Sequence, residues 1–139
     1  MAITHTTAVR NLIADAVGGA FDGGTGRVAI LTGAPVAAGS AQSGSVLATF
    51  TLPSDAFAAA SGGAAALNAV SNVAASAGGT AGSFCIYRTG DTAISSAAGA
   101  SDRRLTGSVA TSGGDMAIDN ATIVNGGTLS LAWSYAAPA

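Results

Sequence analysis

The chain contains no lysine and no glutamate, and charged residues make up only 9% of its 139 positions. Both missing residues are good helix formers and usual solvating residues of exposed faces, so a helical bundle is disfavoured and β-structure with turns is favoured. The 5 basic residues are all arginines, scattered among 7 aspartates, and the formal net charge is -2. Because this balance gives no basic field that could neutralise a run of phosphates, we expect no nucleic-acid partner.

Cysteine and histidine each occur once, as Cys85 and His5. A lone cysteine cannot form a disulfide within the chain, and two potential ligands far apart in the sequence define no metal cluster. Cys85 lies in a strongly apolar stretch, which is typical of a buried small side chain rather than of a reactive thiol. We therefore expect a fold held together by packing, with no cofactor and no metal.

Long apolar runs are also missing. The opening MAITHTTAVRNLIADAV lacks the basic flank and the uninterrupted apolar stretch of a signal peptide, because Arg10, Asn11 and Asp15 interrupt its apolar positions. No apolar span of about twenty residues follows later in the chain. The sequence therefore predicts neither an export signal nor a membrane partner.

Residues 7–20 carry apolar side chains at helical spacing, which predicts one amphipathic helix within an N-terminal helix or arm over residues 1–22. Polar or small residues at 11, 14 and 15 fall on the opposite side. The apolar positions are Val9, Leu12, Ile13, Ala16, Val17 and Ala20. Two roles stay open: the helix covers one open end of a sheet, or it docks on a neighbouring subunit.

After Gly26 the pattern changes to period-two alternation and short apolar runs separated by glycine turns. About eight short strands fit an all-β domain of β-sandwich or jelly-roll type over residues 26–139, and the whole chain 1–139 is expected to form one domain. A turn at 89–91 predicts a hairpin with a return strand around Ile94. The other segments that favour strands are 27–31, 45–52, 67–70, 72–74, 83–87, 105–109, 116–118, 121–124 and 129–135.

No catalytic constellation stands out in the sequence. His5 lies at or before the start of the predicted helix, with no nucleophile elbow in the chain, which favours a solvent-facing or cap-adjacent histidine. Asp115 and Asp119 could form a carboxylate pair, but the turns around them favour bonding to nearby backbone groups. We therefore expect no catalytic residues and no enzymatic activity.

Candidate contact residues come from one loop and from the single charge cluster. The loop at 34–44, which contains Pro35 and Val36, has almost no charge, as expected of a contact loop; a disordered linker is the alternative. Arg103 and Arg104 follow an aspartate, and the cluster is either a solvated loop or a salt link to an acidic patch on a partner.

Strand edges present a second reason to expect protein partners. Exposed edges are ordinarily protected from mutual pairing by lysines, inward charges or prolines, and this chain has no lysine and 3 prolines. The edges and faces are therefore expected to be covered by neighbours, which predicts a homo-oligomer.

Three segments carry a family resemblance: the opening MAITHTTAVRNLIADAV, the middle SVLATFTLPSDAF and the later TSGGDMAIDNATIVNGGTLSL. Together, and in this order over most of the chain, they resemble a family of small structural proteins of tailed-bacteriophage virions. The resemblance implies a capsid decoration or cement protein whose partners are the major capsid protein and copies of itself.

A virion location also accounts for the composition. Chains that are poor in charge and rich in Gly, Ser and Thr are common among exported surface proteins, yet no export signal is seen here. A phage protein made in the host cytoplasm and released by lysis combines both features. A tail or tail-tip component and a receptor- or glycan-binding β-module are the alternatives.

Overall fold

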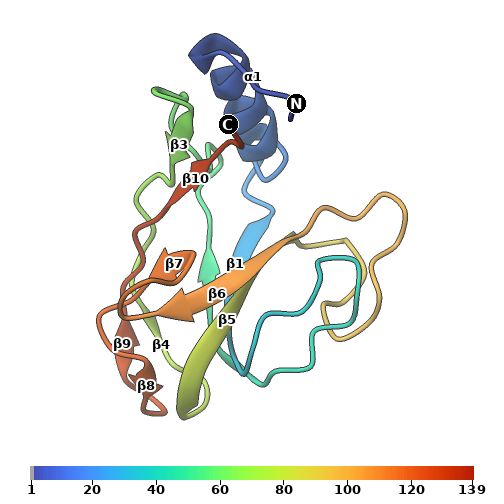
Figure 1. Cartoon of the computed structure of the whole chain (residues 1–139). Helices are drawn as coiled ribbons and strands as arrows, with labels where there is room; N and C mark the ends of the chain where they lie inside the picture. Colours follow the sequence, from blue (N-terminus) through green and yellow to red (C-terminus); the bar gives the residue numbers. More distant parts are fainter. Residues whose placement is uncertain (1) are drawn as a thin grey trace.

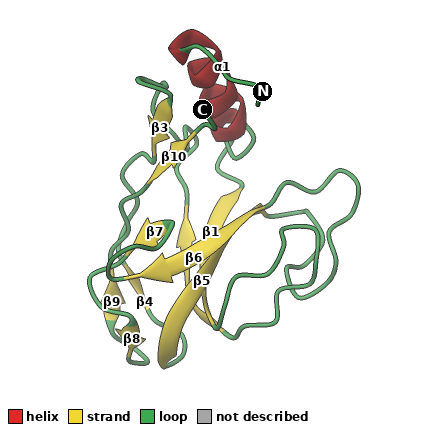
Figure 2. Ribbon diagram, viewed as in Figure 1, coloured by secondary structure: helices red, strands yellow, loops and turns green. Residues whose placement is uncertain are grey.

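The computed structural model describes residues 2–139, which form one α-helix and ten β-strands (Figures 1 and 2). The elements are α1 (Thr7–Gly19), β1 (Gly26–Thr32), β2 (Val46–Thr51), β3 (Ala64–Ala66), β4 (Val73–Ala74), β5 (Gly79–Arg88), β6 (Leu105–Ala110), β7 (Met116–Ala117), β8 (Thr122–Ile123), β9 (Thr128–Leu129) and β10 (Ser134–Ala136). The predicted mostly β chain with one N-terminal helix is confirmed. No helix in residues 2–139 has the length and apolar content needed to cross a membrane.

The main sheet of the described chain has six strands, in the order β2-β1-β5-β6-β7, with β8 paired to the start of β5. Its pairs are antiparallel except β6–β7, which is parallel, so the sheet is mixed. Two further sheets, β3–β10 and β4–β9, have two strands each. This pairing does not by itself define the predicted sandwich or jelly roll, and the strands number ten rather than about eight.

β1 is an interior strand of the main sheet, between β2 and β5, and is covered on both faces. Val28, Ala29, Ile30 and Leu31 are all buried, because the strand is paired along both edges as well. Val28 and Ile30 point into the main core, which also receives side chains from β3, β4, β9 and β10. Ala29 and Leu31 join Cys85 in a smaller core on the opposite face.

Two long loops, residues 33–45 and 89–104, cover this second face, and together we call them the loop lobe. Figure 1 shows both loops on the same side of the main sheet. Ile94 from the second loop and Tyr87 from β5 pack against the smaller core. The lobe thus covers the second face as the small sheets cover the first. On both faces the cover excludes water from buried apolar side chains.

The predicted return strand around Ile94 is wrong. Ile94 lies in a turn, and the strand that pairs with the end of β5 is β6, with Phe84 opposite Gly107. The reason is that the intervening chain is held by side-chain hydrogen bonds rather than by a strand ladder. The strand predicted at 67–70 is likewise displaced, since β3 occupies residues 64–66.

α1 begins and ends close to the predicted positions. Thr6 is the N-cap, and its side chain accepts a hydrogen bond from the Val9 N–H, as a capping threonine does. The helix ends at Gly19, and Ala20 follows with right-handed backbone angles, so the left-handed glycines Gly23 and Gly24 lie in the turn that leads to β1.

Candidate interaction surfaces

α1 divides its apolar residues between the main core, which Ile13 and Val17 contact, and an exposed stripe. Leu12 is 69% exposed and Val9 is 40% exposed, and Ala16 beside them is also exposed. At roughly 100° per residue, these three side chains form one stripe along the helix. The buried residues of α1 are instead Ala14 and Gly18. The helix therefore does cover the core beside β3 and β10, one of the two roles expected, but Leu12 and Val9 take no part in this contact.

The polar side of α1 faces the protein because backbone groups there need partners. Arg10 donates to the carbonyl oxygen of Ala137 at 3.1 Å, next to the end of β10. Asn11 and Asp15 each accept from a backbone N–H in the turn at 60–63, both at 2.7 Å. Unpaired backbone groups near a buried surface are unfavourable, so these three side chains fix the helix in this orientation.

Small residues let α1 approach closely on the same side. A Cβ at Gly18 would lie 3.0 Å from the Cβ of Phe57, which is tighter than ordinary van der Waals contact. Ala14 is fully buried. The helix therefore packs on the protein through small residues surrounded by polar hydrogen bonds, with Ile13 and Val17 half-buried beside them. Only Val9 and Leu12, among its larger apolar side chains, are left exposed.

One flank of the exposed stripe borders an open groove of about 550 Å³. Its helix wall is apolar and includes Ile13, Val17 and Ala20, and its other wall is the segment 102–105. Arg103 is exposed at this groove, and its Nη1 donates to the carbonyl oxygen of Ala20 at 3.3 Å. The groove therefore has an apolar helix wall and a charged opposite wall of Asp102, Arg103 and Arg104, with Arg103 beside the C-terminal end of α1.

The opposite flank of α1 borders an acidic hollow of about 280 Å³. Asp15, Asp22 and Asp55 line it, together with the two glycines at the end of the helix. Asp15 and Asp22 each accept a backbone N–H from the facing loop. Within residues 2–139, no group of three His, Cys or acidic side chains is arranged to hold a metal ion.

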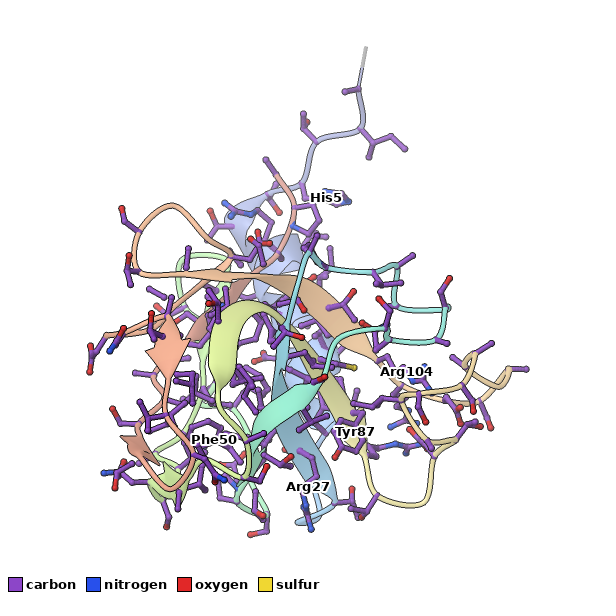
Figure 3. The ribbon with its side chains drawn as sticks, turned by 90° about the horizontal axis from the view of Figure 1, so that it is seen from below. His5, Arg27, Phe50, Tyr87 and Arg104 are labelled. Carbon is purple, nitrogen blue, oxygen red and sulfur yellow. The ribbon has the colours of Figure 1, made fainter. Side chains whose placement is uncertain are left out.

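Arg104 organises the loop lobe rather than facing solvent. Its Nη1 donates to the carbonyl oxygen of Ser96 at 2.9 Å and, more weakly, to that of Ser40 at 3.4 Å. Its Nη2 donates to the carbonyl oxygens of Thr92 and Ala93 at 2.9 and 3.0 Å. Figure 3 shows the side chain between the two loops, on the same side as Tyr87. One guanidinium thus joins both loops.

Two further contacts tie the loops together. The N–H of Gln42, one of the two buried polar residues in the described chain, donates to the carbonyl oxygen of Ile94 at 2.8 Å. The N–H of Ala98 donates to the carbonyl oxygen of Gly39 at 3.0 Å. These bonds give the lobe a defined backbone structure without any strand, so the predicted loop at 34–44 is not a disordered linker.

Carboxylates hold the second loop of the lobe. Asp91 forms an ion pair with Arg88 at 2.7 Å, and this hydrogen bond holds the pKa of Asp91 below its usual value. Asp102 accepts from the N–H groups of Gly99 and Thr92 at 2.7 and 3.1 Å. The pKa of Asp102 is lowered most by a hydrogen bond from the Thr92 side chain and next by the hydrogen bond from the Gly99 N–H.

The four predicted contact residues fall at two separate places. Pro35 is exposed and Val36 is half-buried, both in the loop lobe. Arg103 is exposed at the groove beside α1, whereas the Arg104 guanidinium is used by carbonyl groups inside the lobe. The adjacent arginines therefore have different roles, which the charge cluster in the sequence did not distinguish.

The residues weighed for catalysis are not brought together. His5 lies near the C-terminus, with its Nδ1 3.3 Å from the backbone oxygen of Ala139. Asp115 accepts from both the N–H and the Oγ of Ser108 at 2.8 Å, and the backbone bond is the main reason that its pKa is lowered. Asp119 lines a different hollow, of about 230 Å³. Asp115 thus bonds to nearby backbone, as the sequence indicated.

Cys85 is fully buried in the smaller core, and this burial raises the pKa of its thiol to about 11, against a smaller opposing effect of Arg104. Trp133 packs against the edge of the main core, and the centroid of its ring lies 5.3 Å from that of the Phe84 ring. The Trp133 Nε1 donates to the carbonyl oxygen of Asp115 at 2.7 Å. Both residues are structural, and neither adds a reactive group to a surface.

Comparisons of the chain with protein-family models, with curated protein sequences and with solved structures found no match. What the structure itself defines is a mostly β protein with two distinct surfaces, the exposed side of α1 and the loop lobe. The spacing of apolar residues identified the stripe on α1, but nothing in that spacing gave its direction. The role of Arg104 had no signal in the sequence beyond its charge.

Proposed function

We propose that this protein is a non-enzymatic structural component of a bacteriophage virion, most specifically a capsid decoration or cement protein. One observation carries the proposal: the apolar stripe of α1 points away from the protein's own core. Large exposed apolar side chains such as Leu12, at 69%, are typical of surfaces that another protein covers. The resemblance of three sequence segments to small tailed-phage virion proteins is the reason that we propose a phage particle as the assembly.

The two surfaces suit a protein that sits between neighbours. The α1 side offers contacts to copies of the chain, and the loop lobe, with Pro35 exposed, offers a defined surface to the major capsid protein. A protein that binds only the assembled shell stabilises it by mass action, and repetition over many equivalent sites adds avidity. No cofactor, nucleic acid or membrane is part of this mechanism.

We also propose that the strands form a β-sandwich or jelly roll. A β-sandwich or jelly-roll arrangement would place the small sheets β3–β10 and β4–β9 as a second layer over the main sheet. The main core supports this, because it receives residues from the main sheet and from all four of these strands. An experimental structure of the protein in a particle would test the layer arrangement directly.

The copy number of the protein in purified virions tests the function. Quantitative mass spectrometry against the major capsid protein should give hundreds of copies per particle for a head decoration protein. A handful of copies would overturn head decoration and assign the protein to the tail or tail tip. Absence from the particle would overturn the virion role altogether.

Glycan binding has its own test. Exposed aromatic side chains beside polar groups favour it, and the large apolar side chains exposed in residues 2–139 are all aliphatic. A glycan array with the purified protein should therefore show no binding. Specific, saturable binding of one glycan would favour the receptor-binding alternative instead.

A further inference from the structure

The stripe on α1 lies between two flanks of opposite chemistry. At roughly 100° per residue, the groove residues Ile13, Val17 and Ala20 lie on one side of the Leu12–Ala16 stripe. The acidic hollow borders the other side, through Asp15 and the glycines that follow it. On the groove side the Asp102 carboxylate is held by the N–H groups of Thr92 and Gly99, which leaves Arg103 as the exposed charge. A partner that covers the stripe must therefore face this cation on one side and carboxylates on the other.

Both charged flanks lie at the same height along the helix. Arg103 bonds to the carbonyl oxygen of Ala20, just after the end of α1. Asp22 and Asp55 line the hollow next to Gly19, the last helical residue. The complementary charges are thus level with one another, at the C-terminal end of α1, on opposite sides of the apolar stripe.

We infer that the stripe binds a second copy of this chain, through a two-fold axis that runs parallel to α1. Such a pair is isologous, so the same surface is buried on both copies. Rotation about this axis places the groove flank of one copy against the acidic flank of the other. Arg103 of each copy then faces the partner's Asp22 and Asp55, and Leu12 packs against Leu12.

The alternative orientation separates the opposite charges. In an antiparallel pair, related by an axis perpendicular to the helices, the two C-terminal ends of α1 lie at opposite ends of the interface, so Arg103 of one copy reaches neither Asp22 nor Asp55 of the other. Complementary charges that face each other across an interface favour the orientation that brings them together. Charge complementarity therefore selects the parallel pair. This inference is independent of the virion role, because a dimer in solution would be present whatever the particle contains.

The first experiment compares two substitutions of matched exposure. Leu12 and Val124 are both 69% exposed, but Val124 lies beside β8, away from α1. Sedimentation equilibrium of the wild-type protein over a concentration series should show a dimer. Leu12→Asp should weaken it by about tenfold or more, whereas Val124→Asp should leave it unchanged. A wild-type protein that stays monomeric, or a Leu12→Asp variant that dimerises normally, would overturn the inference.

Cysteine cross-linking tests the orientation and does not depend on Leu12→Asp folding. Val9 and Ala16 are about two helical turns apart. In a parallel pair each residue lies opposite its own copy, so Val9→Cys and Ala16→Cys should each give a disulfide-linked dimer when oxidised alone. An antiparallel pair would cross-link a mixture of the two variants but neither alone, which would overturn the parallel arrangement. The native Cys85 is buried, so the wild-type protein should give no disulfide-linked dimer under the same conditions.

A charge exchange tests the proposed ion pairs. Asp55→Arg is suitable because its carboxylate accepts no hydrogen bond from side chains or backbone in residues 2–139, so no internal contact is lost. Arg103→Asp alone and Asp55→Arg alone should each weaken the dimer, and the double variant should recover much of the loss. Single variants that leave the dissociation constant unchanged would overturn the charge pairing, and with it the choice of axis.

Discussion

Arg104 donates from Nη2 to the carbonyl oxygen of Thr92 across 2.9 Å, although the two residues lie twelve positions apart. The same guanidinium reaches Ser96 in this loop and Ser40 in the other. Because arginine presents several donors in a fixed planar fork, one side chain can hold turns that lysine could not. The loop lobe therefore depends on this residue more than on any strand.

Replacement of Arg104 should loosen the lobe and destabilise the protein. Arg104→Lys keeps the charge but loses the fork, and we expect a loss of about 1–3 kcal/mol in the free energy of unfolding, measured with urea. Arg103→Lys is the matched control, since the exposed Arg103 makes one side-chain hydrogen bond within residues 2–139, and it should change stability by less than about 0.5 kcal/mol. Equal effects at both positions would contradict the role assigned to Arg104.

The thiol of Cys85 should report opening of the lobe. Because burial raises its pKa to about 11, little thiolate is present near neutral pH, and the wild-type protein should react slowly with a thiol reagent. Arg104→Lys should speed the reaction severalfold by admitting solvent to the smaller core. Because Arg104→Lys keeps the positive charge that lowers the Cys85 pKa, a faster reaction would report the entry of solvent, and an unchanged or slower rate would count against lobe opening.

The lobe should also be sensitive to acid. The pKa of Asp102 is lowered from 3.8 in the folded protein, so its contribution to stability is present above the unfolded pKa and is lost as the pH falls through the lower folded value. The free energy of unfolding should therefore decrease as the pH falls below about 4. Asp102→Asn should reduce this dependence, and Asp119→Asn, at a carboxylate without a hydrogen bond in residues 2–139, should preserve it. Unfolding curves at a series of pH values would show either result.

Two neighbouring glycines test how α1 is seated. Gly18→Ala places a Cβ 3.0 Å from the Phe57 Cβ, whose backbone is fixed by a bridge to Leu67, and should destabilise the protein by about 1–3 kcal/mol. Gly19→Ala meets Asp22 only at 3.8 Å and should be neutral or stabilising by up to about 1 kcal/mol, because alanine is the better helix former. A tolerated Gly18→Ala would mean that the helix does not pack as closely as described. Thermal unfolding of both variants distinguishes the cases.

Local sequence patterns were sufficient for the elements whose own residues decide their structure. The helix predicted at 7–20 is observed at Thr7–Gly19, and the strands predicted at 27–31 and 45–52 are observed as β1 and β2. In the helix, both the period of the apolar residues and the capping threonine, Thr6, are encoded within or next to the segment itself, and in the two strands the apolar pattern is. The weak signal in the alanine-rich region gave β4 but misplaced β3, because alanine fits either conformation.

The sequence by itself determined that this chain is mostly β, has one N-terminal amphipathic helix, and carries too little charge to cover its surface in the usual way. Only the tertiary structure decided which side of that helix is exposed. Hydrophobic spacing favours burial of Leu12, but the backbone groups at 60–63 and Ala137 required the polar side of α1 as their partner. In the same way, Arg104 differs from Arg103 because carbonyl groups from two distant loops converge on one guanidinium and not on the other.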